Sequence, residues 1–329
     1  MPVIGRPLIA LTLVVPLALA ACGLGPPEVG VASGRTSARP VTLLVEPDAG
    51  PDGIVDLVKA ARASVWAEIY LLTDDRAVAA LADRARAGCD VRVILEPAPY
   101  MSEDANQPAF AALTAAGALM SWSTPRFTYT HAKALIVDHA RLAVMTLNLT
   151  GAGLGGNREY AAIDDDPADV AAAEAVFAAD QTGDVAAASG RLVTSPDTSR
   201  AVLTDLIAGA TASLAIETEE LTDPAIVAAL TAARGRGVAL TLAWPGPPDA
   251  GAAFATLAAA GAVVRAVADP AIHAKVVVAD ARRLYLGSAN FTATSLDHNR
   301  ELGLLIDDAE AARRVAATVA DDAARGVSP

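Results

Sequence analysis

Apolar and polar positions change period along the chain in a way that predicts strands and helices in alternation. Short apolar runs bounded by turn residues indicate strands, and longer runs with a helical period indicate helices. The elements expected in the first part are a strand from Val41, a helix at about 52–63, a strand at 65–72, a helix at 75–87, a strand at 91–95, a loop at 96–107, a helix to Ala116, strands at 134–137 and 142–147, and a helix at about 167–179. This alternation predicts an α/β fold in which helices cover a sheet.

The same order of elements recurs after Arg191. It predicts a strand, a helix at 199–210, a strand at 213–218, a helix at 223–234, a strand at 238–243, a helix at 250–260 and two strands around Lys275 and Leu286. Glu68 and Glu217 occupy corresponding positions, 149 residues apart. An internal repeat of this size predicts two similar halves, residues 41–183 and 190–326, facing each other across a shared site.

The N-terminus predicts export rather than fold. Arg6 followed by the apolar run 8–21 has the length and charge of a signal peptide, which we assign to residues 1–21. The run ends in Leu-Ala-Ala-Cys, which resembles the lipobox of bacterial lipoproteins, so Cys22 is the expected lipidation site. Residues 22–40 are rich in Gly, Pro and Ser and predict a flexible tether. We therefore expect an exported protein of the bacterial cell envelope, anchored to the membrane through Cys22.

Charge and cysteine content narrow the classes of partner. Without Arg6 the chain has 24 basic and 38 acidic residues, a formal charge of −14, so no stable nucleic-acid partner is expected. With Cys22 lipidated, Cys89 is the one remaining thiol, which excludes an internal disulfide. Its place before an apolar strand favours a buried structural residue. The acidic run 217–220 suggests a cation site or a solvated strand end, of which we favour the second.

One cluster of polar residues occurs in each half at the same spacing. In the first half it comprises His131, Lys133, Asp138, Thr146, Asn148, Asn157 and Glu159; in the second half it comprises His273, Lys275, Asp280, Ser288, Asn290, Asn299 and Glu301. Every member is displaced by 142 positions. The other two histidines, His139 and His298, fall at a hairpin tip and in a loop, where we expect exposure to solvent.

Strand periodicity predicts how the cluster assembles. Residues two apart on a strand share a face, so His131 and Lys133 point the same way. A tight hairpin turn over 138–141, with His139 and Ala140 at its tip, would set His131 opposite Asn148 and Lys133 opposite Thr146. In the second half the same turn would pair His273 with Asn290 and Lys275 with Ser288.

These side chains suit a phosphoryl group. Lys, Asn and hydroxyl donors can hold its non-bridging oxygens and stabilise the charge of a transition state. One imidazole can attack phosphorus while a second, protonated one donates to the leaving oxygen. A carboxylate behind each ring would fix its tautomer, and Glu159 and Glu301 are the candidates for this role.

His-x-Lys-x4-Asp, followed by a small hydroxyl residue and Asn, twice in one chain, resembles the signature of the phospholipase D superfamily. The resemblance covers nearly everything after Val41. It implies two α/β lobes, each a β-sheet flanked by helices, related by a pseudo-twofold axis. It also implies a covalent phosphohistidine intermediate and no catalytic metal or other cofactor.

By this resemblance His131 would be the nucleophile and His273 the general acid and base, although the near-symmetry of the halves leaves their order open. Asp138 and Asp280 would support the motif without touching phosphorus. The family's Gly-Ser pair is present as Gly287-Ser288 but reads Met145-Thr146 in the first half. Met145 would either narrow the pocket or pack in the core.

The expected function is a phospholipase D-type phosphodiesterase that hydrolyses phospholipid head groups in a membrane, working as a monomer with an internal pseudo-dimer. A nuclease or a phosphatidyltransferase of the cardiolipin synthase type would use the same intermediate, so the motif residues do not separate them. A third hypothesis is a non-catalytic envelope lipoprotein that keeps only the fold.

Overall fold

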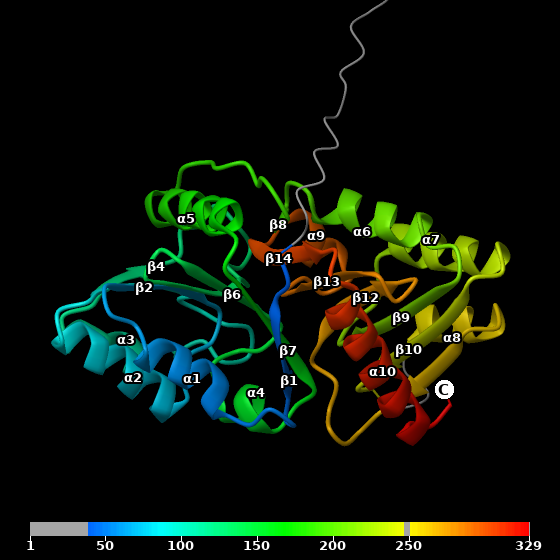
Figure 1. Cartoon of the computed structure of the whole chain (residues 1–329), viewed down its shortest axis with the longest axis horizontal. Helices are drawn as coiled ribbons and strands as arrows, with labels where there is room; N and C mark the ends of the chain where they lie inside the picture. Colours follow the sequence, from blue (N-terminus) through cyan, green and yellow to red (C-terminus); the bar gives the residue numbers. More distant parts are fainter. Residues whose placement is uncertain (1–38, 247–250, 329) are drawn as a thin grey trace, which may run out of the picture. The chain divides into compact units, whose positions relative to one another are not determined.

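Two seven-stranded sheets with the same strand order carry the fold of the computed structural model, which describes residues 39–246 and 251–328 (Figure 1). The first sheet has the order β1-β7-β6-β5-β2-β3-β4, and the second has β8-β14-β13-β12-β9-β10-β11. The strands of the first sheet are β1 (Thr42–Glu46), β2 (Ser64–Ile69), β3 (Asp90–Leu95), β4 (Leu119–Trp122), β5 (Lys133–Val137), β6 (Arg141–Met145) and β7 (Glu159–Asp164). Those of the second are β8 (Leu192–Ser195), β9 (Ser213–Thr218), β10 (Ala239–Trp244), β11 (Val263–Ala266), β12 (Lys275–Ala279), β13 (Arg283–Gly287) and β14 (Glu301–Ile306).

Helices cover both faces of each sheet. The helices of the first half are α1 (Asp52–Lys59), α2 (Asp75–Arg86), α3 (Gln107–Ala115), α4 (Gly151–Gly155) and α5 (Pro167–Thr182). Those of the second half are α6 (Ser199–Ala208), α7 (Pro224–Gly235), α8 (Ala252–Ala259), α9 (Ala293–Asp297) and α10 (Ala309–Arg325). Figure 1 shows α1, α2 and α3 together on one side of the first sheet and α5 on the other. Among the described helices, not one combines the length and apolar character that a membrane span requires.

The core has three parts, of which one is shared by the halves. The first part lies between the first sheet and α1–α3, and a matching part lies between the second sheet and α6–α8. The third joins the inner faces of both sheets with α5 and α10. Strands β5 and β12 are buried along their whole length because they lie in the middle of their sheets, with apolar layers on both faces. The α/β architecture with two similar lobes is confirmed.

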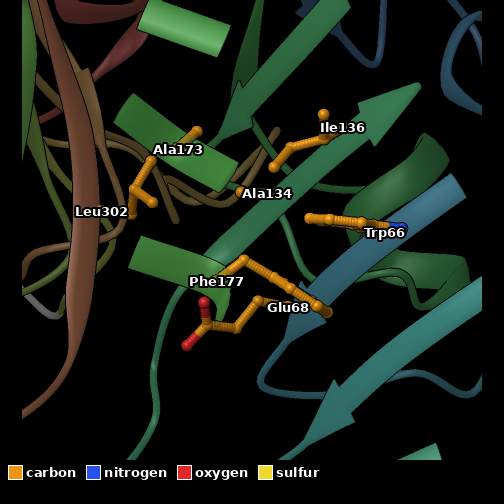
Figure 2. Close-up of a pocket in the computed structure, with 7 residues that line it drawn as sticks. All are labelled: Trp66, Glu68, Ala134, Ile136, Ala173, Phe177 and Leu302. Atoms are coloured by element: carbon orange, nitrogen blue, oxygen red, sulfur yellow. The ribbon is translucent and has the colours of Figure 1, made fainter. Parts of the chain in front are cut away.

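A small cavity in the shared core is lined mainly by apolar side chains. Its lining, drawn in Figure 2, comprises Trp66, Glu68, Ala134, Ile136, Ala173, Phe177 and Leu302. Leu302 belongs to the second half, so the cavity lies where the halves meet. Neither His131 nor His273 lines it, and it is therefore part of the core rather than a candidate site.

The hairpin register predicted from sequence is wrong by one residue. Val137 pairs with Arg141 and Ala134 with Val144, which leaves Met145 rather than Thr146 next in line opposite Lys133. Asp138 and His139 form the tip, with φ of 55° and 53°, so that the turn starts one residue earlier than expected. The second hairpin repeats the shift, because Ala279 pairs with Arg283. A one-residue slip moves side chains to the opposite face, so the predicted Lys133 and Thr146 pairing is not formed.

Several elements were absent from the sequence-based prediction. They are the strands β4, β7, β11 and β14 and the helices α4, α9 and α10. The two strands that matter most are β7 and β14, because Glu159 and Glu301 are their first residues. Residues 1–38, which include the predicted signal peptide, Cys22 and most of the tether, lie outside the described residues.

Two buried ion pairs join the halves reciprocally. Arg158 Nε donates to Asp322 of α10 over 2.6 Å, and Arg300 Nε lies 2.7 Å from Asp180 of α5. Each arginine belongs to one half and its aspartate to the other, at positions that correspond in the repeat. Reciprocal contacts of this kind are those of a twofold interface.

A buried glutamate lies beside each of these aspartates. Glu68 is beside Asp180, and burial, followed by the charge of Asp180, raises the pKa of Glu68 well above its usual range. Glu217 accepts a hydrogen bond of 2.8 Å from the Tyr160 hydroxyl. Burial, followed by the charge of Asp322, also raises the pKa of Glu217. The repeated glutamates of the sequence thus belong to the interface between halves.

We expect the buried Arg300–Asp180 pair to be important for stability. In the Arg300→Met variant Asp180 would remain buried without its partner, so the free energy of unfolding should fall by about 3–5 kcal/mol. Urea unfolding followed by circular dichroism would measure this. The loss should shrink in acid, because protonation removes the charge of Asp180.

The matched control is Arg283→Met, which removes the exposed Arg283–Asp307 pair and should cost less than about 1 kcal/mol. Equal losses in the two variants would contradict a special role for the buried pair.

Candidate active site

Both motif histidines lie just before a central strand, beside the end of an antiparallel neighbour. His131 is two residues ahead of Lys133, which begins β5 and pairs with Ile69 at the end of β2. His273 has the same position ahead of β12, where Lys275 pairs with Thr218 of β9. Each segment is also held by the other half, since the His131 N–H donates to Arg300 O over 2.8 Å and the His273 N–H to Arg158 O over 3.2 Å.

Each histidine ring is bound to a glutamate of the opposite half. His131 Nδ1 lies 2.9 Å from Glu301 Oε2, and His273 Nδ1 lies 2.5 Å from Glu159 Oε1. Both carboxylates are fully buried, whereas the side chains of His131 and His273 are 12% and 19% exposed. The carboxylates therefore fix the inner nitrogen of each ring and leave the outer one, Nε2, for chemistry. The sequence-based prediction did not include that each carboxylate binds the histidine of the opposite half.

The two motif lysines are buried beneath the histidines. Lys133 Nζ donates to His131 O over 2.8 Å and lies 5.2 Å from the centre of the Tyr70 ring. Lys275 Nζ donates to His273 O over 2.5 Å and to Glu219 Oε2 over 2.9 Å. Since neither lysine side chain is exposed, their charges are available only to groups inside the site.

The motif asparagines and hydroxyl residues have different tasks. The Oδ1 atoms of Asn148 and Asn290 are buried and have no hydrogen-bond partner among the described residues, so each has an acceptor left for a donor group. The Thr146 hydroxyl instead donates to Glu159 Oε2 over 2.5 Å, which orients the carboxylate that holds His273. Ser288 Oγ accepts from the Leu302 N–H over 3.0 Å, as Thr146 does from Tyr160.

Asp138 and Asp280 lie at the far ends of β5 and β12 from the histidines. Asp138 accepts hydrogen bonds from the N–H groups of residues 62, 63 and 64, and Asp280 does so from those of residues 211, 212 and 213. Burial alone would raise the pKa of Asp138, but these donors outweigh it and lower that pKa. The two aspartates fasten each hairpin tip to the start of a neighbouring strand, β2 or β9, and lie outside the set of groups around the histidines.

Burial and neighbouring charges set the protonation of the first motif. Burial lowers the pKa of His131 below its usual value, against the opposing charge of Glu301. Burial also lowers the pKa of Lys133, to about 7. Burial would raise the pKa of Glu301, but the charge and hydrogen bond of His131 outweigh it and keep that pKa low. His131 is therefore neutral at pH values where an exposed histidine would still be partly charged.

Met145 packs in the core. It is fully buried among the side chains under the first sheet. At the corresponding position a Cβ on Gly287 would lie 2.8 Å from Tyr285 Oη and 2.6 Å from Gly303 Cα. The first half has Ala143 where the second has Tyr285, so space freed by the smaller residue is filled by Met145. The departure from the family's Gly-Ser pair is a packing exchange.

Two site residues were missed by sequence reasoning. The Tyr70 ring packs edge-on against His131 with 4.5 Å between ring centres, and Glu219 Oε2 lies 3.4 Å from His273 Nε2. They are corresponding residues, since each directly follows β2 or β9. The preference for a solvated strand end at 217–220 was wrong, because Glu217 is fully buried and Glu219 faces the site. The repeat of Glu68 and Glu217 was the signal that could have found them. These glutamates lie near the ends of β2 and β9, and two residues further on they mark Tyr70 and Glu219 as corresponding positions.

Other expectations for single residues have mixed outcomes. His139 and His298 are exposed as predicted. Cys89, predicted as a buried structural residue, is only partly buried and packs against the core under the first sheet. Among the described residues, no three His, Cys, Asp or Glu side chains are arranged to hold a metal ion.

Comparison with known proteins identifies the family. The family model described as cardiolipin synthase, PLD-like domain, matches residues 54–181 and 203–322, which is more than half of the chain and one match for each half. The chain belongs to the phospholipase D superfamily. Each match covers six of the seven strands of one sheet, all but β1 or β8, so the superfamily's repeat and the internal repeat of this chain are the same feature.

Solved structures of the phospholipase D fold resemble this chain over most of its length. Phosphatidylserine synthase from Haemophilus influenzae Rd KW20 is 12% identical, with a TM-score of 0.65 over 87% of this chain and 86% of that one. Polyphosphate kinase from Porphyromonas gingivalis is 17% identical, with a TM-score of 0.68 over 86% of this chain. This chain spans 50% of that kinase. At these identities the likeness concerns the fold. No match to a curated protein was found.

We expect Glu301→Gln to reduce turnover strongly. The amide cannot stabilise a charge on His131 or hold its Nδ1–H as a carboxylate does, so kcat for a phosphodiester should fall by about 10²–10⁴-fold. The matched control is Glu174→Gln, since Glu174 contacts the exposed His139 at 2.6 Å outside the site. Steady-state kinetics would compare them. Similar rates for the two variants would argue against crossed support of the histidines.

The dependence of kcat/KM on pH should be bell-shaped with a low optimum. A His131 that acts as nucleophile must be neutral, and burial lowers its pKa, so the acid limb should lie below the usual range of a histidine. Lys133 must be charged to hold a phosphoryl group, and with a pKa of about 7 it loses its proton as the pH rises through neutrality. The alkaline limb should therefore begin near pH 7. A flat profile between pH 7 and 9 would mean that Lys133 keeps its charge.

Proposed function

We propose that this protein cleaves the phosphodiester of membrane phospholipids, releasing the head-group alcohol through a phosphohistidine intermediate. The crossed pairs of His131 with Glu301 and His273 with Glu159 carry this proposal. They supply two imidazoles whose inner nitrogens are held by carboxylates, above two buried lysines. Such a set serves a reaction in which one ring attacks phosphorus and another carries a proton.

In the first step His131 Nε2 attacks phosphorus. The bond from phosphorus to the head-group oxygen breaks, and His273 Nε2–H donates its proton to that oxygen. Lys133, Lys275 and the two motif asparagines hold the non-bridging oxygens. The head-group alcohol leaves, and the phosphatidyl group remains bonded to His131.

In the second step water enters. His273 removes a proton from water, the resulting oxygen attacks phosphorus, and the bond from phosphorus to His131 Nε2 breaks. Phosphatidic acid is released, His131 is neutral again and His273 is protonated again. The burial of His131 supports its assignment as the nucleophile, because burial favours the neutral ring.

A second candidate is transfer of the phosphatidyl group to an alcohol, such as the head group of another lipid. The description of the matching family model, cardiolipin synthase, favours this alternative. Chemistry to the intermediate is unchanged, and only the acceptor in the second step differs. The two reactions are separated by the products formed when glycerol or phosphatidylglycerol is added.

The proposed setting is the bacterial envelope. The apolar run 8–21 and the Cys that follows it support export and lipid anchoring at Cys22. An anchor would keep the site close to lipid, and the acidic composition disfavours nucleic acid as substrate. We further propose that a single chain suffices, since both halves of the site come from one chain.

Replacement of His131 by Ala should abolish lipid cleavage. We expect the full chain in mixed micelles to release head group from phosphatidylcholine or phosphatidylglycerol, with a loss of about a thousandfold or more in the variant. His139→Ala is the matched control, because His139 lies outside the site and should retain activity. Single-stranded DNA is assayed in parallel.

Each outcome decides between the candidates. Cleavage of DNA alone would replace the lipid proposal by a nuclease. Full lipid cleavage after replacement of either His131 or His273 would overturn the shared site. Substrate labelled at phosphorus, quenched in alkali, should leave label on the wild type and on His273→Ala but not on His131→Ala.

A further inference from the structure

Glu219 contacts Lys275, which the proposed reaction assigns to the non-bridging oxygens, and His273, which it assigns to the leaving oxygen. Its Oε2 lies 2.9 Å from Lys275 Nζ and 3.4 Å from His273 Nε2. The side chain is 32% exposed, whereas Lys275 is fully buried beneath it. A carboxylate oxygen therefore lies where an oxygen of a bound phosphodiester would have to lie to receive the same donors.

The backbone that carries Glu219 is fixed, so the contact does not depend on a loose loop. The Phe291 N–H donates to Glu220 O over 3.1 Å, and the N–H groups of Thr222 and Asp223 both donate to Phe291 O. Strand β9 ends one residue before Glu219. Rotation of the Glu219 side chain would release Lys275 and His273, and its partial exposure leaves room for that rotation.

The first half has no acid at the corresponding position. Tyr70 stands there, directly after β2, with its ring against His131 and its hydroxyl accepting from the Tyr100 N–H over 2.7 Å. At this position one side of the site has a neutral side chain and the other a carboxylate. The acid is a property of the His273 side and not of the repeat.

Two anions cannot share Lys275 and His273. When a phosphoryl group binds, the Glu219 carboxylate must turn away, yet its fixed backbone keeps it near the bound anion. Repulsion between them grows with the charge of the anion. A phosphodiester carries one negative charge, whereas a phosphomonoester or inorganic phosphate carries between about 1.5 and 2 at neutral pH. Glu219 therefore weakens binding of the monoester more than of the diester.

We propose that Glu219 is a specificity-determining residue that occupies the phosphoryl position of the free site and makes the site select singly charged phosphodiesters over doubly charged phosphomonoesters. The carboxylate competes with every anion but is displaced at least cost by a diester. After cleavage the product is a monoester, and the returning carboxylate expels it. This last consequence rests on the proposed hydrolysis, whereas the competition for Lys275 and His273 does not.

The direct test measures binding of inorganic phosphate without turnover. Isothermal titration at pH 7.5 into the full chain should give about tenfold tighter binding for Glu219→Gln than for the wild type, equivalent to about 1.4 kcal/mol. Glu220→Gln is the matched control, because it removes the same charge from the neighbouring residue, whose side chain has no hydrogen bond or ion pair to Lys275 or His273. Its affinity should change by less than about threefold.

Kinetics with the lipid substrate give the second readout. Glu219→Gln should lower the KM for the diester slightly and be inhibited about tenfold more strongly by phosphatidic acid. A fall in kcat of about a hundredfold in that variant would instead assign Glu219 a role in proton transfer and overturn the proposal. Equal gains in phosphate affinity for Glu219→Gln and Glu220→Gln, or no gain in either, would also overturn it.

The two proposals fail separately. If neither lipid nor DNA is cleaved by any form of the protein, the proposed function fails. The difference in phosphate affinity between Glu219→Gln and Glu220→Gln would still be measurable and would still decide the role of Glu219.

Discussion

The Arg-Glu dipeptides at 158–159 and 300–301 each connect the two halves through two contacts. Each arginine forms a buried ion pair with a helix of the other half, and each glutamate holds the histidine of the other half. A half on its own would have a histidine without its carboxylate and a buried aspartate without its arginine. Assembly of the interface and orientation of the two motif histidines therefore occur together, because neighbouring residues perform both. Burying these charges is costly, and only complete pairing across the interface makes it tolerable.

Much of the fold followed from local pattern. Two patterns were sufficient to predict two α/β halves and the residues that gather between them. One is the alternation of strand and helix, and the other is the recurrence of the polar cluster 142 positions further along the chain. The register of the motif hairpins was not predictable in the same way. It depends on a turn with positive φ at Asp138 and His139, and on bonds from Asp138 to backbone more than seventy residues earlier. Such a long-range tether leaves no periodic signal in the sequence.

Other site features were hidden for related reasons. Strands β7 and β14 are buried almost throughout, so they lack the alternation that marks a half-exposed strand. The exchange of glutamates between halves is a spatial relation, and two identical motifs cannot reveal whether each carboxylate serves its own histidine or the other. Glu219 was assigned to solvent because an acidic run usually is solvated. Its lysine partner is 56 residues away and on another strand.

The difference between Tyr70 and Glu219 shows what covalent linkage of the two halves permits. A homodimer of one half would carry the same residue on both sides, either two tyrosines or two glutamates, because one gene would encode both. Duplication within one chain removes this constraint, and each copy can then diverge alone. The second half has Tyr285 and Gly287 where the first has Ala143 and Met145, so the two copies also differ in how their cores pack. Fusion thus allows two equivalent imidazoles to acquire unlike surroundings, which a symmetric ancestor could not have given them.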